Sequence, residues 1–348
     1  QGSPPRTSSA PAGTVLVPRT RFHFQSGGVE IEGGCDSSKD TAGTGICCEG
    51  MHACPGSEEC YDQCAFGGVD SRGVDVQFPW EVAPQRFHDA WLDIGPFFID
   101  RHLVTNAEFA RYLRATDYRP RDPFNYLKHW TGGSPRSEDA QKPVVWVTLE
   151  EARGYCAWAG KRLPHAYEWQ LAAQGTDGRT YPWGSEMNRS AFPTPGHGRQ
   201  VPKLPDVGSF PAGDSPFGMA DAVGLVWQFT DSFQDDRTRA VLLKGSSIYN
   251  PVLGGDFPAT MQIGNWYFPA ARKLTLHNRL MLMDESYDRA ATLGFRCVAD
   301  HFDGAPGPHH VHSSATGSTL LQEATGDAAL SQCLRHGGAR APCRASGR

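Results

Sequence analysis

The spacing of the cysteines constrains this chain more than any other feature of its sequence. Ten cysteines are present, and six of them lie close together: Cys35, Cys47, Cys48, Cys54, Cys60 and Cys64. The other four are Cys156, Cys297, Cys333 and Cys343. Zinc sites favour two C-x-x-C pairs, and the cluster contains none, so the spacing favours disulfide bonds over metal ligation. Because disulfides persist in oxidising compartments, we expect a secreted or extracellular protein.

Composition indicates the kind of fold that these cysteines hold together. Of the 348 residues, 39 are glycine and 26 are proline, so turns are expected to outnumber long regular elements. Hydrophobic residues make up 39%, which is enough to bury a sizeable core. The formal net charge is -5 without a long block of one sign, so we expect no nucleic-acid partner. No apolar run approaches the roughly 18 residues of a membrane span.

Changes in composition divide the chain into four regions: an N-terminal lead and first strand at 1–34, a cysteine-rich disulfide loop at 35–75, one compositional unit at 76–300, and a low-complexity tail at 301–348. Alternating apolar residues around glycine pairs predict a short hairpin over 14–34.

In the tail, we expect Cys333 and Cys343 to close a small loop. The chain begins at Gln1 with no visible leader, which we interpret as a mature form or an engineered chain.

Three helices are predicted in the central unit. A threonine followed three residues later by a glutamate is a capping box, and this pattern starts the first two helices, at Thr105 with Glu108 and at Thr148 with Glu151. The third helix is expected to begin after Pro164. The rest of the unit reads as loops and short strands.

A series of short motifs follows in a fixed order through the central unit. They include Lys142-Pro143-Val144-Val145-Trp146, Tyr155-Cys156-Ala157-Trp158, Tyr181-Pro182-Trp183-Gly184, Phe217-Gly218-Met219-Ala220-Asp221, Lys244-Gly245-Ser246-Ser247 and Leu293-Gly294-Phe295-Arg296-Cys297. Together they resemble the formylglycine-generating enzyme, or sulfatase-modifying factor, family. The resemblance covers residues from about 80 to 300. It implies an α+β fold, a variant of the C-type-lectin-like fold with little regular secondary structure.

The resemblance also implies one specific disulfide. In the family, the cysteine of the second helix pairs with the cysteine of the final Gly-Phe-Arg-Cys motif. Carried over to this chain, the pair is Cys156 with Cys297. The alternative is that both are buried free thiols.

The copper site of the family has no counterpart in this sequence. Family enzymes hold copper with two cysteines just after the strand that contains Ser247. Asn250 stands about where the first cysteine is expected, and no cysteine occurs between Cys156 and Cys297. Copper(I) prefers soft sulfur ligands, which an amide cannot replace. We therefore expect neither copper nor formylglycine generation.

A calcium-binding segment of the family is also altered. The family has Gly-Asn-x-Trp-Glu-Trp, whereas this chain has Gly224-Leu225-Val226-Trp227-Gln228-Phe229. Leu225 has no oxygen to donate, and the carbonyl of Gln228 is a weaker ligand than a carboxylate. We expect this site to be lost or weakened. A calcium ion held elsewhere, by Asp206, Asp214, Asp221 or Asp231 with backbone carbonyls, is left open.

The segment 244–296 corresponds to the substrate groove of the family. Its aromatic and polar residues are candidates for ligand binding: Tyr249, Asn250, Trp266, Tyr267, Arg272, His277, Asn278 and Arg289. Trp266 and Tyr267 could stack on a sugar ring or a peptide side chain, and Arg272 could pair with an anionic group. The alternative is that the aromatic side chains are core and the charged ones are solvated.

Three further features bear on function. His277 with Asp284 or Asp288 is a candidate metal site. Asn188 begins an Asn-Arg-Ser glycosylation sequon. His165 and Tyr167 stand where the family usually has small or acidic residues, and we assign them no role.

Two functions are consistent with these observations. We favour a binding or structural extracellular glycoprotein over an enzyme, with a protein or glycan as its ligand and an extracellular assembly as a possible setting. The alternative is a metal-dependent oxidoreductase of the same superfamily with a different active site.

Overall fold

The structure is a computed structural model of the chain. It describes residues 7, 9–27, 30–31, 75–85, 87–186, 188–194, 196–197, 203–235, 240–250, 275–276 and 289–301. These parts form an α+β fold of short helices and small sheets, as the resemblance implies. None of the helices in the described part of the chain is long and apolar enough to cross a lipid bilayer.

Local capping signals determine where the α-helices begin, and these helices are α2 (Asn106–Thr116), α3 (Leu149–Trp158) and α4 (Ala166–Gln174). The hydroxyl groups of Thr105 and Thr148 accept from the backbone N–H groups of Glu108 and Glu151. The glutamate side chains accept in return from the threonine N–H groups, so both predicted capping boxes are confirmed. Two short 3-10 helices are η2 (Ser137–Asp139) and η3 (Pro211–Gly213).

A three-stranded antiparallel sheet joins the beginning and the end of the described chain. It has the order β1-β5-β12, with β1 (Thr14–Val17), β5 (Phe97–Asp100) and β12 (Val298–Asp300). All four residues of the central strand β5 are buried. The backbone N–H and C=O groups of β5 are paired with its two neighbours. The strand can therefore be buried without leaving these polar groups unsatisfied.

A five-stranded mixed sheet forms the middle of the fold. Its order is β11-β7-β8-β10-β3, with β11 (Leu293–Gly294), β7 (Trp227–Phe233), β8 (Val241–Lys244), β10 (Thr275–Leu276) and β3 (Glu30–Ile31). Strands β7 and β8 are antiparallel, whereas β11 runs parallel to β7. Two further ladders pair β2 (Thr20–Gly27) with β4 (Phe87–Ile94) and β6 (Gly196–His197) with β9 (Tyr249–Asn250).

The predicted hairpin over 14–34 is wrong. The strands in this segment pair with distant partners instead of with each other: β1 with β5, β2 with β4, and β3 with β10. Val17, Phe22 and Phe24 are 0%, 3% and 0% exposed in one core that they share with Phe97. Burial of these large side chains against distant strands outweighs the local turn, because each buried side chain contributes about 1.5–3 kcal/mol.

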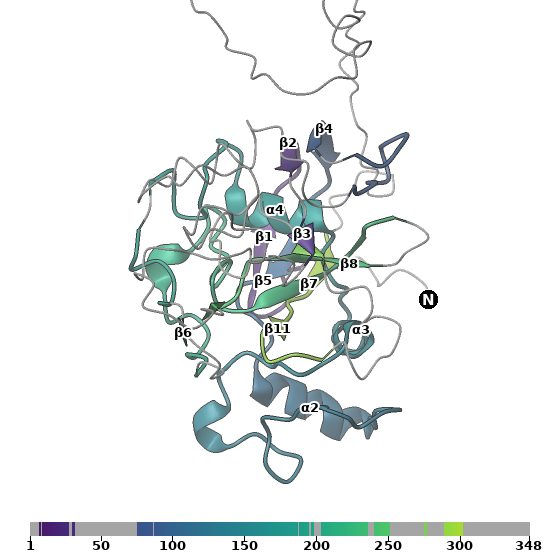
Figure 1. The fold of residues 1–348 in the computed structure, drawn as a ribbon, viewed down its shortest axis with the longest axis vertical. Helices are drawn as coiled ribbons and strands as arrows, with labels where there is room; N and C mark the ends of the chain where they lie inside the picture. The colour runs from purple at the N-terminus through teal and green to yellow at the C-terminus, as the bar shows by residue number, and fades with distance from the viewer. Residues whose placement is uncertain are drawn as a thin grey trace, which may run out of the picture. The chain divides into compact units, whose positions relative to one another are not determined.

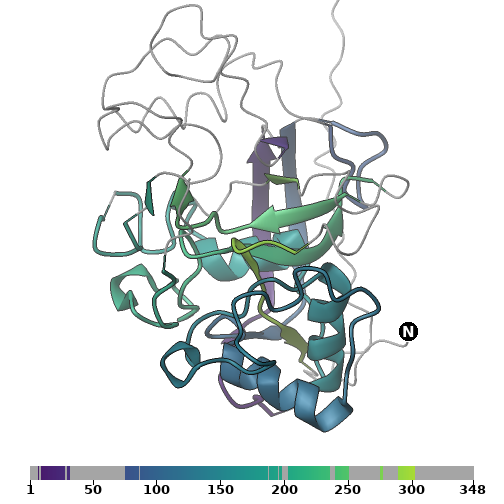
Figure 2. The ribbon, with the colours of Figure 1, turned by 60° about the horizontal axis from the view of Figure 1, so that its bottom comes forward.

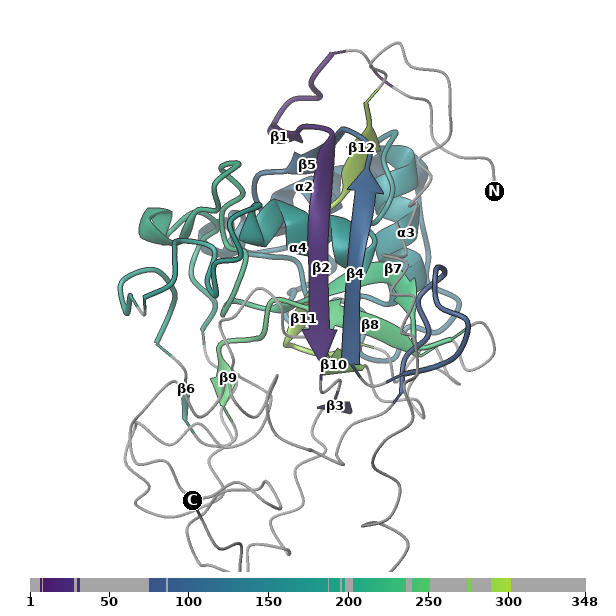
Figure 3. The ribbon, with the colours of Figure 1, turned by 90° about the horizontal axis from the view of Figure 1, so that it is seen from above.

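The sheet of β7 and β8 separates two cores. Phe229 and Leu243 pack with α2 and α3 on one side, and Leu242 packs with α4 on the other. This alternation follows the two-residue period of a strand. Figures 1 and 2 show α2 and α3 together on one side of this sheet. Figure 3 shows α4 behind the β2–β4 ladder, so this helix lies between that ladder and the sheet.

Candidate functional site

The strand that precedes the family's copper cysteines ends in a sharp turn. Gly245 and Ser246 have φ angles of +97° and +57°, in the left-handed region that favours glycine. A Cβ atom on Gly245 would lie 2.7 Å from the carbonyl oxygen of Ala222, so the position requires glycine. Ser246 and Ser247 are 1% and 0% exposed. The turn therefore buries both hydroxyl-bearing side chains before the chain enters β9.

The backbone of β9 runs beside a segment about fifty residues earlier in the chain. Tyr249 and Asn250 pair in parallel register with Gly196 and His197 of β6. For both Tyr249 and Asn250 the structure describes the backbone. Asn250, which the resemblance places about where the first copper cysteine of the family stands, thus lies in a two-stranded ladder.

The side-chain amide of Gln228 joins the backbone at Asp221 and Ala222 to Trp169 and Arg296. Its Nε2 atom donates to the carbonyl oxygens of Asp221, at 3.2 Å, and Ala222, at 3.0 Å. Its Oε1 atom accepts from Trp169 Nε1 and from Arg296 Nε, both at 2.8 Å. Two donors and two acceptor positions are therefore all used by protein groups. No cation is needed to satisfy the polar atoms of this side chain.

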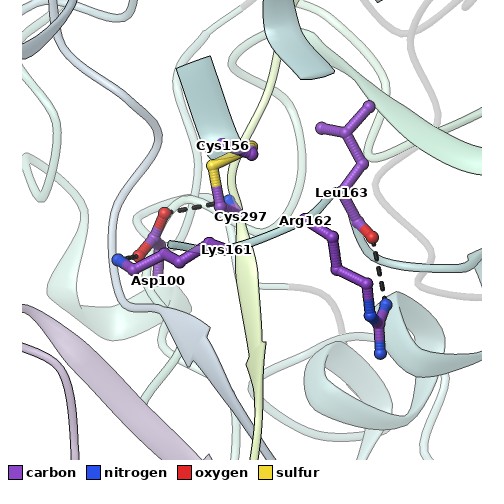
Figure 4. Close-up of a disulfide and its surroundings, with 6 residues drawn as sticks. All are labelled: Asp100, Cys156, Lys161, Arg162, Leu163 and Cys297. Carbon is purple, nitrogen blue, oxygen red and sulfur yellow. Dashed lines mark hydrogen bonds and ion pairs between the residues drawn. A yellow bond between two sulfur atoms is a disulfide. The ribbon is translucent and has the colours of Figure 1, made fainter. Parts of the chain in front are cut away.

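The Cys156–Cys297 disulfide is present, and the pairing that the resemblance implies is confirmed. The Cα atoms are 5.6 Å apart, and both residues are 0% exposed. Asp100 lies beside the bond, where one carboxylate oxygen accepts from the backbone N–H of Cys297 at 2.9 Å and the other from Lys161 Nζ at 2.5 Å. Figure 4 shows these groups around the two sulfur atoms, with Arg162 on the other side. The disulfide thus joins α3 to the start of β12, next to the hydrogen bonds that Asp100 makes to Cys297 and Lys161.

Most of the predicted ligand and metal candidates lie outside the described residues: Trp266, Tyr267, Arg272, His277, Asn278, Asp284 and Asp288. The same holds for eight cysteines: Cys35, Cys47, Cys48, Cys54, Cys60, Cys64, Cys333 and Cys343. In the described part of the chain, no three His, Cys, Asp or Glu side chains come together to hold a metal ion.

Arg289 is the one candidate from this set whose side chain the structure describes, and it faces the protein. It is 4% exposed. Its guanidinium donates to the carboxylate of Glu151 at 2.5 Å and 3.2 Å, and to the carbonyl oxygens of Asp122 and Phe124 at 2.7 Å. The positive charge is thus neutralised by a buried carboxylate at the start of α3. In this structure Arg289 anchors the described segment 289–301 to the start of α3.

The predicted glycosylation site is exposed. The Oδ1 atom of Asn188 accepts from the backbone N–H of Ser190 at 3.0 Å and from its hydroxyl at 2.7 Å. The sequon therefore forms a local turn closed by its own side chains.

A cavity of about 360 Å³ opens where α4 begins. It is lined by residues of three segments: Gln77, Phe78, Pro79, Glu81, His165, Tyr167, Asp231, Ser232, Phe233 and Asp235. The segments are far apart in the sequence, so no local pattern predicts the cavity. A volume of this size falls at the lower end of small-ligand sites.

The His165 ring is held in one orientation at the wall of this cavity. Its Nδ1 atom lies 2.9 Å from the carbonyl oxygen of Asp231, and its ring stacks on that of Tyr167 at 5.2 Å. A carbonyl oxygen accepts only, so Nδ1 carries the proton and Nε2 is an acceptor in the neutral ring. The start of α4 is fixed to β7 by two more bonds, from the Asp231 N–H to the Pro164 carbonyl and from the Ala166 N–H to Ser232 Oγ.

A buried ion pair supports the same helix start. Arg162 donates to both carboxylate oxygens of Glu168 at 2.7 Å, and also to Asp300 at 2.7 Å. Glu168 accepts in addition from the His165 N–H at 2.8 Å. Burial alone would raise the pKa of Glu168. The Arg162 guanidinium outweighs this effect and lowers the pKa to about 2. The carboxylate is therefore charged in the folded protein at any ordinary pH.

We expect Glu168→Gln to lower the free energy of unfolding by about 3 kcal/mol at pH 7. Because the pKa of Glu168 is lower in the folded state, its contribution is present above about pH 4.5 and is lost as the pH falls. At pH 3 the difference in the free energy of unfolding between variant and parent should be less than half of its value at pH 7. Urea unfolding at the two pH values measures this. Glu150→Gln, at an exposed carboxylate of α3, is the control, and an equal loss at both pH values would contradict the charge argument.

His165 and Tyr167 are the site residues to which the sequence assigned no role. Their departure from the residues that the family usually has at these positions was the available signal. It did not locate a cavity, because the opposite wall comes from Gln77 to Glu81 and from the end of β7.

Comparisons with known proteins agree with the fold. The model of the sulfatase-modifying factor enzyme 1-like domain matches residues 71–301. Formylglycine-generating enzyme of Mycobacterium tuberculosis is 28% identical over 282 residues, which cover 61% of this chain and 90% of that protein. Hercynine oxygenase of the same organism is 31% identical over 236 residues, covering 60% of this chain and 54% of that protein.

A mammalian protein and a solved structure are also similar. The Bos taurus protein named inactive C-alpha-formylglycine-generating enzyme 2 is 31% identical over 199 residues, covering 44% of this chain and 66% of that protein. The structure of PvdO from Pseudomonas aeruginosa has a TM-score of 0.43 at 20% identity, and covers 66% of this chain and 90% of that one. Since the family model matches well over half of the residues, this chain belongs to the sulfatase-modifying factor enzyme 1-like family, which includes the formylglycine-generating enzymes.

Proposed function

We propose that this chain is a family member that does not generate formylglycine and acts as an extracellular binding protein. The observation that carries the proposal is the cysteine pattern. Cys156 and Cys297 are bonded to each other, and no other cysteine lies between them. The segment between β8 and Cys297 therefore offers no thiol pair to copper(I), and Asn250 is a hard ligand in place of a soft one. These donors do not fit the copper site that the family resemblance implies.

Two observations support the extracellular part of the proposal. The disulfide joins two fully buried cysteines, and eight further cysteines make an even total of ten. Such a content is typical of proteins that mature in an oxidising compartment. The Asn188 sequon is exposed, as a glycan acceptor must be. The similarity to a protein named as inactive is in keeping with a non-catalytic role.

A second candidate function is that of a metal-dependent oxidoreductase. The similarity to hercynine oxygenase favours it, although the chain spans 54% of the length of that enzyme. The residues that would serve as ligands are His277 with Asp284 or Asp288. Metal content separates the two candidates, because a redox enzyme of this kind needs a stoichiometric transition metal.

The test of the proposed function combines an assay with a metal analysis. The full chain is incubated with copper, oxygen and a cysteine peptide that a formylglycine-generating enzyme converts. We expect no aldehyde by mass spectrometry, while the M. tuberculosis enzyme, as a positive control, converts the peptide. Aldehyde formation, or one iron or copper per chain in the purified protein, would overturn the binding proposal.

A further inference from the structure

We propose that the cavity beside His165 binds a small organic cation, an amine or guanidinium group. The group could belong to a free small molecule or to a lysine or arginine side chain of a peptide. This inference rests on the proposed binding role and names the chemistry of the ligand. It concerns a different part of the fold from the turn at Gly245 that corresponds to the family's copper site.

The charge of the cavity walls favours a cation. Three carboxylates line it, from Glu81, Asp231 and Asp235, and no lysine or arginine is among the described residues of the lining. Among the described residues, the Glu81 carboxylate accepts from the Phe78 N–H at 2.8 Å, the Gln85 amide at 2.6 Å and the His88 ring at 2.7 Å. The Asp231 carboxylate is shared with Arg153, which is not among the lining residues, and the carboxylate oxygens of these walls would attract a further cation that enters the cavity.

The hydrogen-bonding groups of the walls are mainly acceptors. Gln77 donates through Nε2 to the Glu81 carbonyl at 3.1 Å, which leaves its Oε1 atom without a partner in the described structure. His165 donates through Nδ1, which leaves Nε2 as an acceptor. Asp231 uses one carboxylate oxygen for Arg153, and the other has no partner among the described residues. Acceptors are the groups that an ammonium ion, with its three N–H donors, requires.

The apolar walls suit the stem and the face of such a ligand. Phe78, Tyr167 and Phe233 present aromatic rings, and a cation near an aromatic face gains electrostatic attraction. The chain itself contains an example of this arrangement. The guanidinium of Arg153 lies 5.3 Å from the centroid of the Phe233 ring and donates to Asp231. The same two residues that line the cavity thus already bind a guanidinium group.

The experiment is a binding titration by calorimetry with matched cationic and neutral probes. Butylamine and butylguanidine are compared with butanol, and the blocked peptide Ala-Lys-Ala with Ala-Met-Ala. We expect the cationic probes to bind and the neutral ones to bind at least roughly tenfold more weakly, because a charge-assisted hydrogen bond is lost. Binding of the peptide without binding of butylamine would identify a protein side chain as the source of the cation.

Asp231→Asn tests the site itself, because it keeps the shape of the side chain and removes the negative charge that Arg153 and the ligand would share. We expect roughly tenfold or greater loss of affinity for the cationic probes. Asp93→Asn, at an exposed carboxylate of β4, makes the same change in net charge outside the cavity and should leave affinity unchanged. Equal loss in both variants, or equal binding of butanol and butylamine, would overturn the proposal.

A measurement on the unaltered protein tests the cavity even if the Asp231→Asn variant does not fold. In the nitrogen NMR spectrum, butylamine should shift the Nε2 resonance of His165. The Nδ1 resonance should still report a protonated nitrogen. Saturating amine with no shift at His165 would also overturn the proposal. Detection of formylglycine would refute the proposed function without changing either result for the cavity.

Discussion

Replacing Arg296 with methionine is expected to lower the free energy of unfolding by at least about 4 kcal/mol, because it removes five buried hydrogen bonds. The side chain is 0% exposed. It donates at 2.8–3.0 Å to five neutral oxygens: the carbonyls of Asp100, Arg101, Ala220 and Asp221, and Oε1 of Gln228. Each acceptor left without a partner costs about 1–3 kcal/mol, and removal of a buried charge returns part of this sum.

The environment of Arg296 explains why a lysine would not replace it well. Burial lowers the pKa of Arg296 to about 10, and the nearby carboxylates oppose this effect. A lysine starts from a lower pKa and has three donors in place of five, so it would leave acceptors unpaired. We expect Arg296→Lys to lie close to Arg296→Met in stability.

Arg101→Met is the matched control for this experiment. Arg101 donates to Asp214 at 2.7 Å, but its side chain is 45% exposed, so the pair should contribute less than about 1 kcal/mol. Urea unfolding followed by tryptophan fluorescence compares the variants under non-reducing conditions. If Arg296→Met cost no more than Arg101→Met, the five carbonyl contacts would not be a principal support of the fold.

The parts of the fold that could be predicted from the sequence are those with local causes. The starts of α2 and α3 follow from Thr105 and Thr148 with their partner glutamates, because a capping box needs only four consecutive residues. The Cys156–Cys297 disulfide came from the family resemblance and not from spacing. Ordered motifs place residues in a known fold even where no periodicity is visible.

The pairing of the strands could not be predicted, because their partners are distant. Residues 14–31 contain three strands whose partners begin at Phe97, Phe87 and Thr275. The sequence shows alternation, which is common to all strands, but alternation does not identify the neighbour. The choice of neighbour depends on which surfaces the whole chain can bury.

Some features of the candidate site could likewise be predicted from the sequence, and others could not. The expectation that this chain holds no copper rests on residue types alone, since Asn250 and the lack of cysteines between Cys156 and Cys297 are visible in the sequence. The role of Arg289 could not be predicted, because its partner Glu151 lies 138 residues earlier and the charge alone favours a ligand site equally well. The cavity beside His165 needed three distant segments to be placed together.

Replacing both Cys156 and Cys297 with alanine is expected to lower the free energy of unfolding by about 4–5 kcal/mol. The bond closes a loop with a sequence separation of 141 residues. In the chain-entropy model, cross-linking so long a loop removes many conformations from the unfolded state, and this value is the upper estimate. Both side chains are fully buried, and alanine is only slightly smaller, so loss of packing should add little.

The single variants provide the internal control, because either one breaks the same bond. Cys156→Ala, Cys297→Ala and the double variant should therefore be destabilised to nearly the same extent, a strongly non-additive result. Urea unfolding of all three, with the parent protein in reduced and oxidised forms, measures the effect. If the double variant lost the sum of the two single losses, each cysteine would act through its own packing. The family fold of this chain would then be held at the α3–β12 junction by burial and by Asp100, and not by the covalent bond.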